Sequence, residues 1–234
     1  MIRSAYASTA RVLGRTTDRI GLTRALEARP GRKSLYVRSL FAIYDLERML
    51  DLDVPWWTFG AIDQVEGHLA ALRGKARVFE FGSGASTVWL ARRAAEVHSV
   101  EHDPAFADRM ADPARSSGAQ LHVVPPTAND RPNIPSKRRG HQGLDFSRYV
   151  ATIDDVGGLF DLIVIDGRAR ASALQRSQSH LAPGGLLVFD NAGRVRYGPA
   201  LSSSSLVFTR MVGLAPALPY QSCTALGRSP SENR

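Results

Sequence analysis

The chain has 234 residues, of which 44% are hydrophobic and 22% are charged, and no apolar run approaches the roughly 20 residues that cross a bilayer. This composition is that of a globular domain and excludes a wholly disordered or membrane-embedded protein. The net charge of +8 fits an anionic partner, but we find no nucleic-acid-binding motif beside it and do not expect nucleic acid as the partner.

Residues 1–54 form the first predicted unit, a basic and helical N-terminal extension. The first thirty residues contain six arginines but only Asp18 and Glu27 as acids, which is typical of an organellar transit peptide as well as of a loose basic helix. No secretory-type apolar segment is present, and the single cysteine fits a reducing compartment. We expect a cytoplasmic protein. Apolar residues at helical spacing predict one amphipathic helix over 35–50.

The second predicted unit is one α/β domain over residues 55–228, with a short tail at 229–234. A helix begins after Thr58, and Trp56 and Trp57 at its start suit either core packing or a pocket wall. From residue 76, short apolar runs alternate with helical stretches, the pattern of parallel strands joined by crossover helices. Strands are predicted at 77–81, 97–101, 121–124, 161–166 and 186–190, with helices at 86–94, 104–110, 149–156 and 170–180.

Two last apolar runs, 206–212 and 221–226, lie too close together for a crossover helix and predict an antiparallel pair at the sheet edge. The fold class is therefore a doubly wound, mostly parallel seven-stranded α/β sheet of Rossmann-like type. Residues 125–146 break the pattern as a long basic loop, for which a lid and simple disorder both stay open. His141 in this loop is a candidate catalytic base.

A glycine turn joins the first strand to its helix in the segment EFGSGAST, residues 80–87. Gly82 and Gly84 permit positive φ and a close approach of a ligand to the backbone. Exposed N–H groups at the helix start, helped by Ser86 and Thr87, suit a carboxylate or phosphate. A purely structural turn is the alternative, because Gly-x-Gly alone is weak evidence.

Glu101 ends the next predicted strand, nineteen residues after Gly82. A carboxylate there can accept hydrogen bonds from both ribose hydroxyls of an adenosine. Dinucleotide folds prefer a third glycine where this chain has Thr87, and Glu80 would repel a pyrophosphate but suits an amino-bearing ligand. These residues favour S-adenosylmethionine over NAD.

Four segments in order then resemble the motifs of class I S-adenosylmethionine-dependent methyltransferases. They are residues 80–87, 100–103 (VEHD), 160–167 (FDLIVIDG) and 183–191 (PGGLLVFDN), and the resemblance covers about residues 55–226. It implies that the glycine loop holds the methionine part of the cofactor and that Glu101 holds the ribose. The candidate cofactor-binding residues are Glu80, Gly82, Ser83, Gly84, Ser86, Thr87, Glu101 and His102.

Asp166, Asp190 and Asn191 end two strands and form an all-oxygen set that suits Mg²⁺. The set resembles that of the catechol O-methyltransferase group, although that group has a lysine where this chain has Ala169. Arg168 and Arg170 beside it suit an acidic substrate. The alternative is that Asp166 caps its own loop and that Asp190 and Asn191 only shape a turn.

The sequence thus predicts an enzyme that transfers a methyl group from S-adenosylmethionine to a small-molecule acceptor. We expect oxygen as the acceptor atom, with nitrogen as the alternative, and Asp166 and His141 as catalytic candidates. Two other functions stay open: an NAD(P)-dependent oxidoreductase, and a non-catalytic cofactor-binding module that acts on RNA or a partner protein. The acceptor cannot be deduced from these residues, because variable loops build substrate pockets.

Overall fold

The computed structural model describes residues 26, 28, 31–42 and 45–230. The arginine-rich start of the chain, for which a transit peptide was one interpretation, lies outside the described residues, as does most of the predicted tail. Among the described residues, no helix is both long and apolar enough to cross a membrane.

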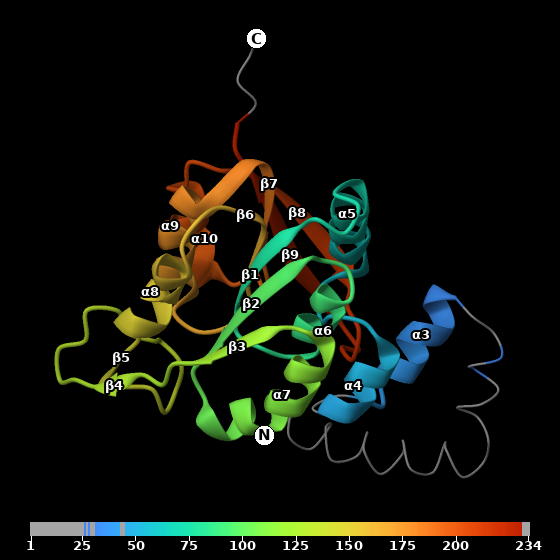
Figure 1. The fold of residues 1–234 in the computed structure, drawn as a ribbon, viewed down its shortest axis with the longest axis horizontal. Helices are drawn as coiled ribbons and strands as arrows, with labels where there is room; N and C mark the ends of the chain where they lie inside the picture. The colour runs from blue at the N-terminus through green and yellow to red at the C-terminus, as the bar shows by residue number, and fades with distance from the viewer. Residues whose placement is uncertain (1–25, 27, 29–30, 43–44, 231–234) are drawn as a thin grey trace.

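A seven-stranded sheet forms the centre of the protein, in the order β3-β2-β1-β6-β7-β9-β8 (Figure 1). Neighbours among β1, β2, β3, β6 and β7 pair in parallel, whereas β9 is antiparallel to both β7 and β8. The predicted fold class and the antiparallel pair at the edge are thereby confirmed. The strands are β1 (Arg77–Phe81), β2 (Glu96–Glu101), β3 (Gln120–Val123), β6 (Phe160–Ile165), β7 (Leu181–Phe189), β8 (Val207–Leu214) and β9 (Gln221–Arg228).

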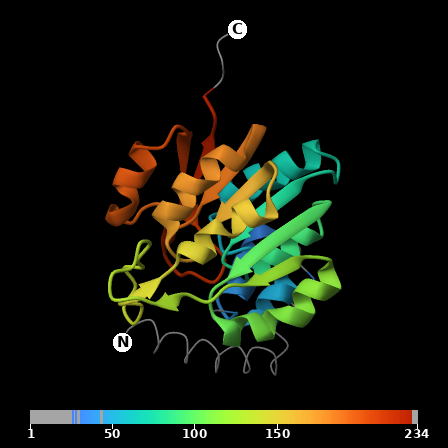
Figure 2. The ribbon, with the colours of Figure 1, turned by 60° about the vertical axis from the view of Figure 1, so that its left-hand side comes forward.

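Helices cover both faces of the sheet, because side chains along each buried strand alternate between two cores. Val78 and Leu162 belong to one hydrophobic cluster, while Phe79 and Ile163 belong to the other. Figure 2 shows α8 and α9 in front of the sheet and the N-terminal helices behind it. The helices are α3 (Arg32–Ser39), α4 (Leu46–Leu52), α5 (Phe59–Ala71), α6 (Ala85–Ala91), α7 (Pro104–Ser117), α8 (Ser147–Val156), α9 (Arg170–Ser177) and α10 (Gly198–Ser202), with short 3-10 turns η1 (Gln178–His180) and η2 (Val195–Tyr197).

The prediction of a single helix over residues 35–50 is wrong, because α3 ends at Ser39 and a separate helix, α4, begins at Leu46. Asp45 explains why a second helix begins here. It is the N-cap residue of α4, and its side chain accepts a hydrogen bond from the Arg48 N–H. Met49 of α4 is buried in the same cluster as Val65 of α5. The boundary at residue 54 stays a proposal, and the described helices before it share the core of the domain.

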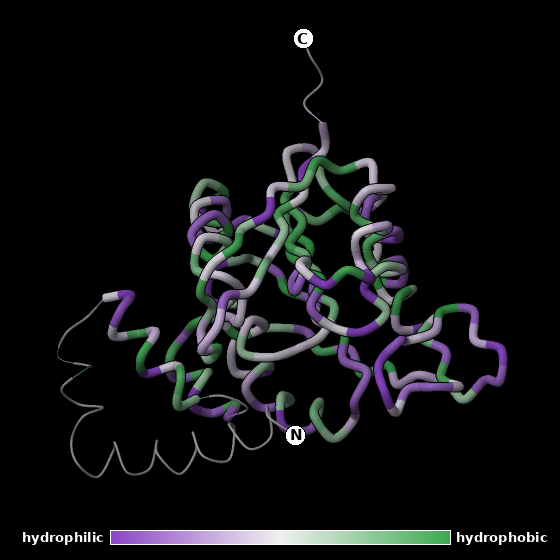
Figure 3. Tube along the Cα trace, turned by 180° about the vertical axis from the view of Figure 1, so that it is seen from behind, coloured by the Kyte–Doolittle hydropathy of each residue, from purple (hydrophilic) through white to green (hydrophobic). Residues whose placement is uncertain are grey.

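The long loop predicted over 125–146 is ordered around a buried carboxylate. It contains the short antiparallel strands β4 (Thr127–Ala128) and β5 (Leu144–Asp145). Asp145 accepts hydrogen bonds from the backbone N–H groups of Asn133 and Ser147, both at 2.8 Å. In Figure 3 this excursion projects from the side of the protein and is largely hydrophilic, unlike the centre of the protein. The loop therefore has a fixed shape without a large apolar core of its own.

Candidate functional site

A pocket of about 440 Å³ opens where β1 and β2 end. Gly82 turns the chain there with a φ of +93°, a conformation that favours glycine. A Cβ on Gly82 would lie 2.5 Å from the Cα of Gly167, because the loops after β1 and β6 touch. Both the backbone conformation and the lack of space thus require glycine at residue 82.

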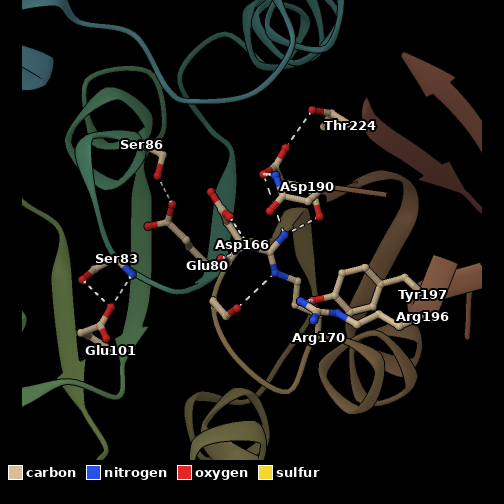
Figure 4. A network of polar contacts seen from close by, with 12 residues as sticks. Glu80, Ser83, Ser86, Glu101, Asp166, Arg170, Asp190, Arg196, Tyr197 and Thr224 are labelled. Atoms are coloured by element: carbon tan, nitrogen blue, oxygen red, sulfur yellow. Dashed lines mark hydrogen bonds and ion pairs between the residues drawn. The ribbon is translucent and has the colours of Figure 1, made fainter. Parts of the chain in front are cut away.

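Glu101 lies on the wall of this pocket at the end of β2, with 4% of its surface exposed. Its Oε1 accepts from the backbone N–H groups of His102 at 2.8 Å and Asp103 at 2.9 Å. Its Oε2 accepts from the N–H of Ser83 at 3.1 Å and from the Ser83 hydroxyl at 3.2 Å (Figure 4). The hydrogen bonds and the nearby His102 imidazole hold the pKa of Glu101 below its usual value, although burial opposes them. The carboxylate is therefore ionised and oriented to accept hydroxyl donors.

The structure brings most of the predicted cofactor residues into this one pocket. The lining includes Gly82, Ser83, Gly84, Ser86, Glu101 and His102. Leu46 and Met49 of α4 and Phe106 of α7 add apolar walls. Its volume is within the range of roughly 300–1,000 Å³ typical of cofactor sites. An ionised carboxylate, a glycine turn and apolar walls together fit an adenosyl cofactor.

Glu80 and Thr87, which are also predicted cofactor-binding residues, do not line the pocket. Both are fully buried beneath the glycine turn. The Glu80 carboxyl accepts hydrogen bonds from Ser86 Oγ at 2.5 Å, Thr87 Oγ1 at 2.5 Å and Ser99 Oγ at 2.8 Å. Burial nevertheless raises the pKa of Glu80 to about 7. Glu80 thus ties β1, β2 and α6 together and supports the turn from below.

Asp166 and Asp190 meet at the ends of β6 and β7, which are adjacent strands as predicted. Arg170, at the start of α9, reaches between them (Figure 4). Its Nη2 donates to Asp166 Oδ1 at 2.6 Å, and its Nη1 donates to the carbonyl of Asp190 and lies 3.8 Å from Asp190 Oδ2. Thr224 Oγ1 of β9 donates to Asp190 Oδ1 at 3.0 Å. The single positive charge of a buried arginine therefore lies between the two carboxyl groups and offsets one negative charge.

The predicted Mg²⁺ set of Asp166, Asp190 and Asn191 is not supported by this arrangement. The guanidinium of Arg170 already supplies the positive charge between the two carboxylates. The Asn191 amide nitrogen, rather than its oxygen, points at Asp190 and donates to Oδ2. Within the described part of the chain, no group of three His, Cys, Asp or Glu side chains is placed to hold a metal ion. The residues present do not fit a divalent cation.

Burial raises the pKa of both carboxyls above the ordinary range, and for Asp190 the pKa reaches about 7. Arg170 opposes this effect on each of them. Asp190 is 3% exposed, whereas the Asp166 side chain keeps 25% of its surface exposed. Asp166 is therefore the more accessible of the two.

His141 lines neither pocket, so the structure does not support its predicted role as a base. Its ring stacks on Phe146 with centroids 5.7 Å apart and also contacts the ring of His102. Burial lowers the pKa of His141, and the charges of His102 and Arg138 lower it further. His141 belongs to an aromatic cluster that connects the long loop to the end of β2.

A larger pocket of about 1,270 Å³ adjoins the first and extends towards β7, β8 and β9. Asp166, Gly167, Arg168, Arg138 and Trp56 line both pockets. Trp57, in contrast, is fully buried in the core, so each of the two interpretations of the tryptophan pair holds for one member.

Sequence reasoning missed the contribution of α4, and it placed Arg170 towards a substrate instead of between the carboxylates. The spacing of Arg170 from Asp166, four residues apart at a helix start, was the available signal for an internal ion pair.

Comparisons with known proteins agree with this geometry. Residues 79–192 match the family model of a methyltransferase domain. No curated protein sequence matches the chain.

Solved structures similar to the chain include the N-methyltransferase NodS from Bradyrhizobium japonicum WM9, with 20% identity over 72% of this chain and 94% of that one, at a TM-score of 0.46. An rRNA methylase from Streptococcus thermophilus shares 13% identity over 72% and 96% of the two chains, at a TM-score of 0.48. CalS10, an amino pentose methyltransferase from Micromonospora echinaspora, shares 18% identity over 74% and 92%, at a TM-score of 0.45. The segment that matches the methyltransferase domain includes the glycine turn, Glu101, Asp166 and Asp190, so it contains residues of both pockets.

Proposed function

We propose that this protein transfers the methyl group of S-adenosylmethionine to an oxygen atom of a small-molecule acceptor that binds in the larger pocket. One observation carries the proposal: Asp166 lines both pockets, so one carboxylate faces the cofactor side and the acceptor side. The oxidoreductase alternative is not favoured, because the family model that matches is a methyltransferase domain. Nitrogen remains the second candidate for the acceptor atom.

Glu101, His102, Ser83 and the backbone of Gly82 and Gly84 would hold the cofactor, with Glu101 accepting from the ribose hydroxyls. When bound, S-adenosylmethionine supplies a methyl group that is already activated by its sulfonium. The remaining work of the protein is to orient the acceptor and to exclude water. Apolar walls from Met49 and Phe106 suit this second task.

Asp166 is the proposed acceptor of the hydroxyl proton. Its raised pKa makes it a stronger base than an ordinary carboxylate, and Arg170 fixes its orientation with a hydrogen bond of 2.6 Å. Asp190, held by Thr224 and Arg170, acts as a positioning residue behind it. Because the two carboxyls interact, the protons they release belong to the pair.

The test combines binding and turnover. Isothermal titration with S-adenosylmethionine and with NAD should give binding of the first only, and labelled S-adenosylmethionine should label acceptors in a metabolite extract. Asp166→Asn should lower turnover by roughly 10²–10⁴-fold, the range for loss of a general base, while the dissociation constant of S-adenosylmethionine changes little. Equal binding of both ligands, or tight RNA binding without methyl transfer on any acceptor, would contradict the proposal.

A further inference from the structure

The acceptor side of the larger pocket is strongly cationic. Seven basic side chains besides Arg170 line it, whereas its only acidic residues are Asp166 and Asp190. Because Arg170 already pairs with both of these carboxylates, at most one uncompensated negative charge is left to face the other seven cations. These seven residues, which we call the cationic wall, are Lys137, Arg138, Arg139, Arg168, Arg194, Arg196 and Arg210.

Two side chains of the cationic wall donate hydrogen bonds to neutral groups. Arg196 Nη2 donates to Tyr197 Oη at 3.2 Å, and Arg210 Nη1 donates to the carbonyl of Ala192 at 3.5 Å. The Nε of Arg168 is buried without a hydrogen-bond partner. No side chain of the cationic wall forms an ion pair with a carboxylate of the described residues, in contrast to Arg92 and Arg93, which both pair with Asp53.

Like charges within this wall act on one another. Burial lowers the pKa of the Arg194 guanidinium, and the neighbouring guanidinium groups of Arg170 and Arg196 lower it further. Crowding cations in a partly desolvated pocket costs free energy, which a bound anion would recover. The arrangement is therefore one that an anionic ligand stabilises.

Four separate segments contribute to the cationic wall: residues 135–139 of the long loop, residues 194–197 after β7, Arg210 of β8, and Arg168 in the loop after β6. The first segment is held in place by Asp145, which also accepts a hydrogen bond from the Ile134 N–H. The second follows a left-handed turn at Asn191, whose φ is +55°. Residues far apart in the sequence thus converge on one pocket, instead of lying along the basic stripe expected of a nucleic-acid-binding surface.

We propose that the methyl acceptor carries a phosphate or sulfate group, which binds to the cationic wall while a hydroxyl of the same molecule lies beside Asp166. The inference rests on the proposed function and names its substrate class. A phosphate or sulfate has enough oxygen atoms to accept from several guanidinium groups at once, whereas a carboxylate has only two. The space of about 1,270 Å³ admits a small molecule with such a group.

The test measures the binding of inorganic anions to the protein. Inorganic phosphate, sulfate and acetate are titrated by calorimetry into the full chain, the double variant Arg194→Gln/Arg196→Gln and the control Arg148→Gln. Arg148 is exposed on α8 and lines neither pocket. Phosphate and sulfate should bind the wild type at least about tenfold more tightly than acetate, and the double variant should weaken them by about tenfold. The control should change the dissociation constants less than about twofold, as expected for a distant charge.

Parallel titration with S-adenosylmethionine separates this proposal from the proposed function. If S-adenosylmethionine binds but phosphate and sulfate bind no better than acetate, or if the control weakens them as much as the double variant, the acceptor class is wrong and the function stands. If S-adenosylmethionine fails to bind, the function is wrong whatever the anions do. A third outcome concerns RNA. If a ten-nucleotide RNA binds and the double variant weakens it, while phosphate and sulfate do not bind, then the ligand of the cationic wall is nucleic acid and the proposed acceptor class is wrong.

Discussion

Glu101 is the residue on which we expect cofactor binding to depend most, because it is a buried carboxylate that lines the smaller pocket. Glu101→Ala should weaken S-adenosylmethionine binding by about 1–3 kcal/mol, since ribose hydroxyls would lose their acceptor. Calorimetry measures the effect. Glu96→Ala removes a carboxylate from the other end of the same strand, away from the pocket, and serves as the matched control.

Two outcomes are informative for Glu101. The variant also deprives the Ser83, His102 and Asp103 N–H groups of their acceptor, so Glu101→Gln, which keeps one carbonyl oxygen, should recover part of the folding stability. An unchanged dissociation constant in a folded Glu101→Ala protein would remove this residue from the cofactor site.

Glu80 predicts a pH dependence of stability. Its pKa is raised from the ordinary 4.5 to about 7, mainly by burial, so the folded protein holds this proton more tightly than the unfolded chain does. The free energy of unfolding should therefore fall as pH rises from 4.5 to about 7, by at most on the order of 3 kcal/mol from this group. Glu80→Gln has no proton to lose and should remove this part of the slope.

Denaturant unfolding at a series of pH values measures the Glu80 effect as the difference between the two slopes. Asp166 and Asp190 contribute in the same direction in both proteins, because their pKa values are raised too. Identical slopes for the variant and the wild type would show that Glu80 titrates normally in the folded state.

At the scale of elements, the contact between the loops after β1 and β6 fixes the shape of the site. Gly82→Ala should lower the free energy of unfolding by more than the roughly 1–2 kcal/mol that a positive φ costs an alanine, because its Cβ would clash with the backbone of Gly167. It should also weaken S-adenosylmethionine binding.

Gly74→Ala is the matched control for that clash. Gly74 also has a positive φ, of +72°, but a Cβ there would meet no atom within 4 Å. Denaturant unfolding and calorimetry compare the two variants. Equal losses in stability and no effect on cofactor binding would show that the loops after β1 and β6 adjust freely.

The bounds of helices and strands could be predicted closely from the sequence where apolar residues recur with a clear period. The predicted strand 77–81 matches β1, and the close spacing of the last two runs correctly indicated an antiparallel pair. Glu101 and Asp166 could be proposed as site residues because they lie at the ends of buried strands that meet at one edge of the sheet. Such local signals do not depend on distant packing.

The rest depends on contacts between distant residues. Nothing local to Glu80 indicates that its side chain points under the turn towards Ser99, since that direction follows from strand pairing. The helix break before Asp45 and the pairing of Arg170 with Asp190 likewise arise from tertiary structure. The sequence pattern identified the polar residues of the site but not which of them face the ligand.

For the whole molecule, the internal ion pair of Arg170 predicts metal independence. Turnover in an assay with labelled S-adenosylmethionine should be the same with and without a chelator, because the residues at the ends of β6 and β7 already contain their own cation. Loss of activity on chelation, restored by Mg²⁺ alone, would contradict this assignment and reinstate the metal interpretation of Asp166, Asp190 and Asn191.

Trp56 gives the protein a built-in optical reporter. Its indole lines both pockets, whereas Trp57 and Trp89 are 0% and 2% exposed and remain in constant surroundings. Indole emission shifts in wavelength and intensity when its environment changes from water to a ligand surface. Light emitted by this one ring should therefore register cofactor and acceptor separately, and the order in which they arrive can be followed in real time without a label.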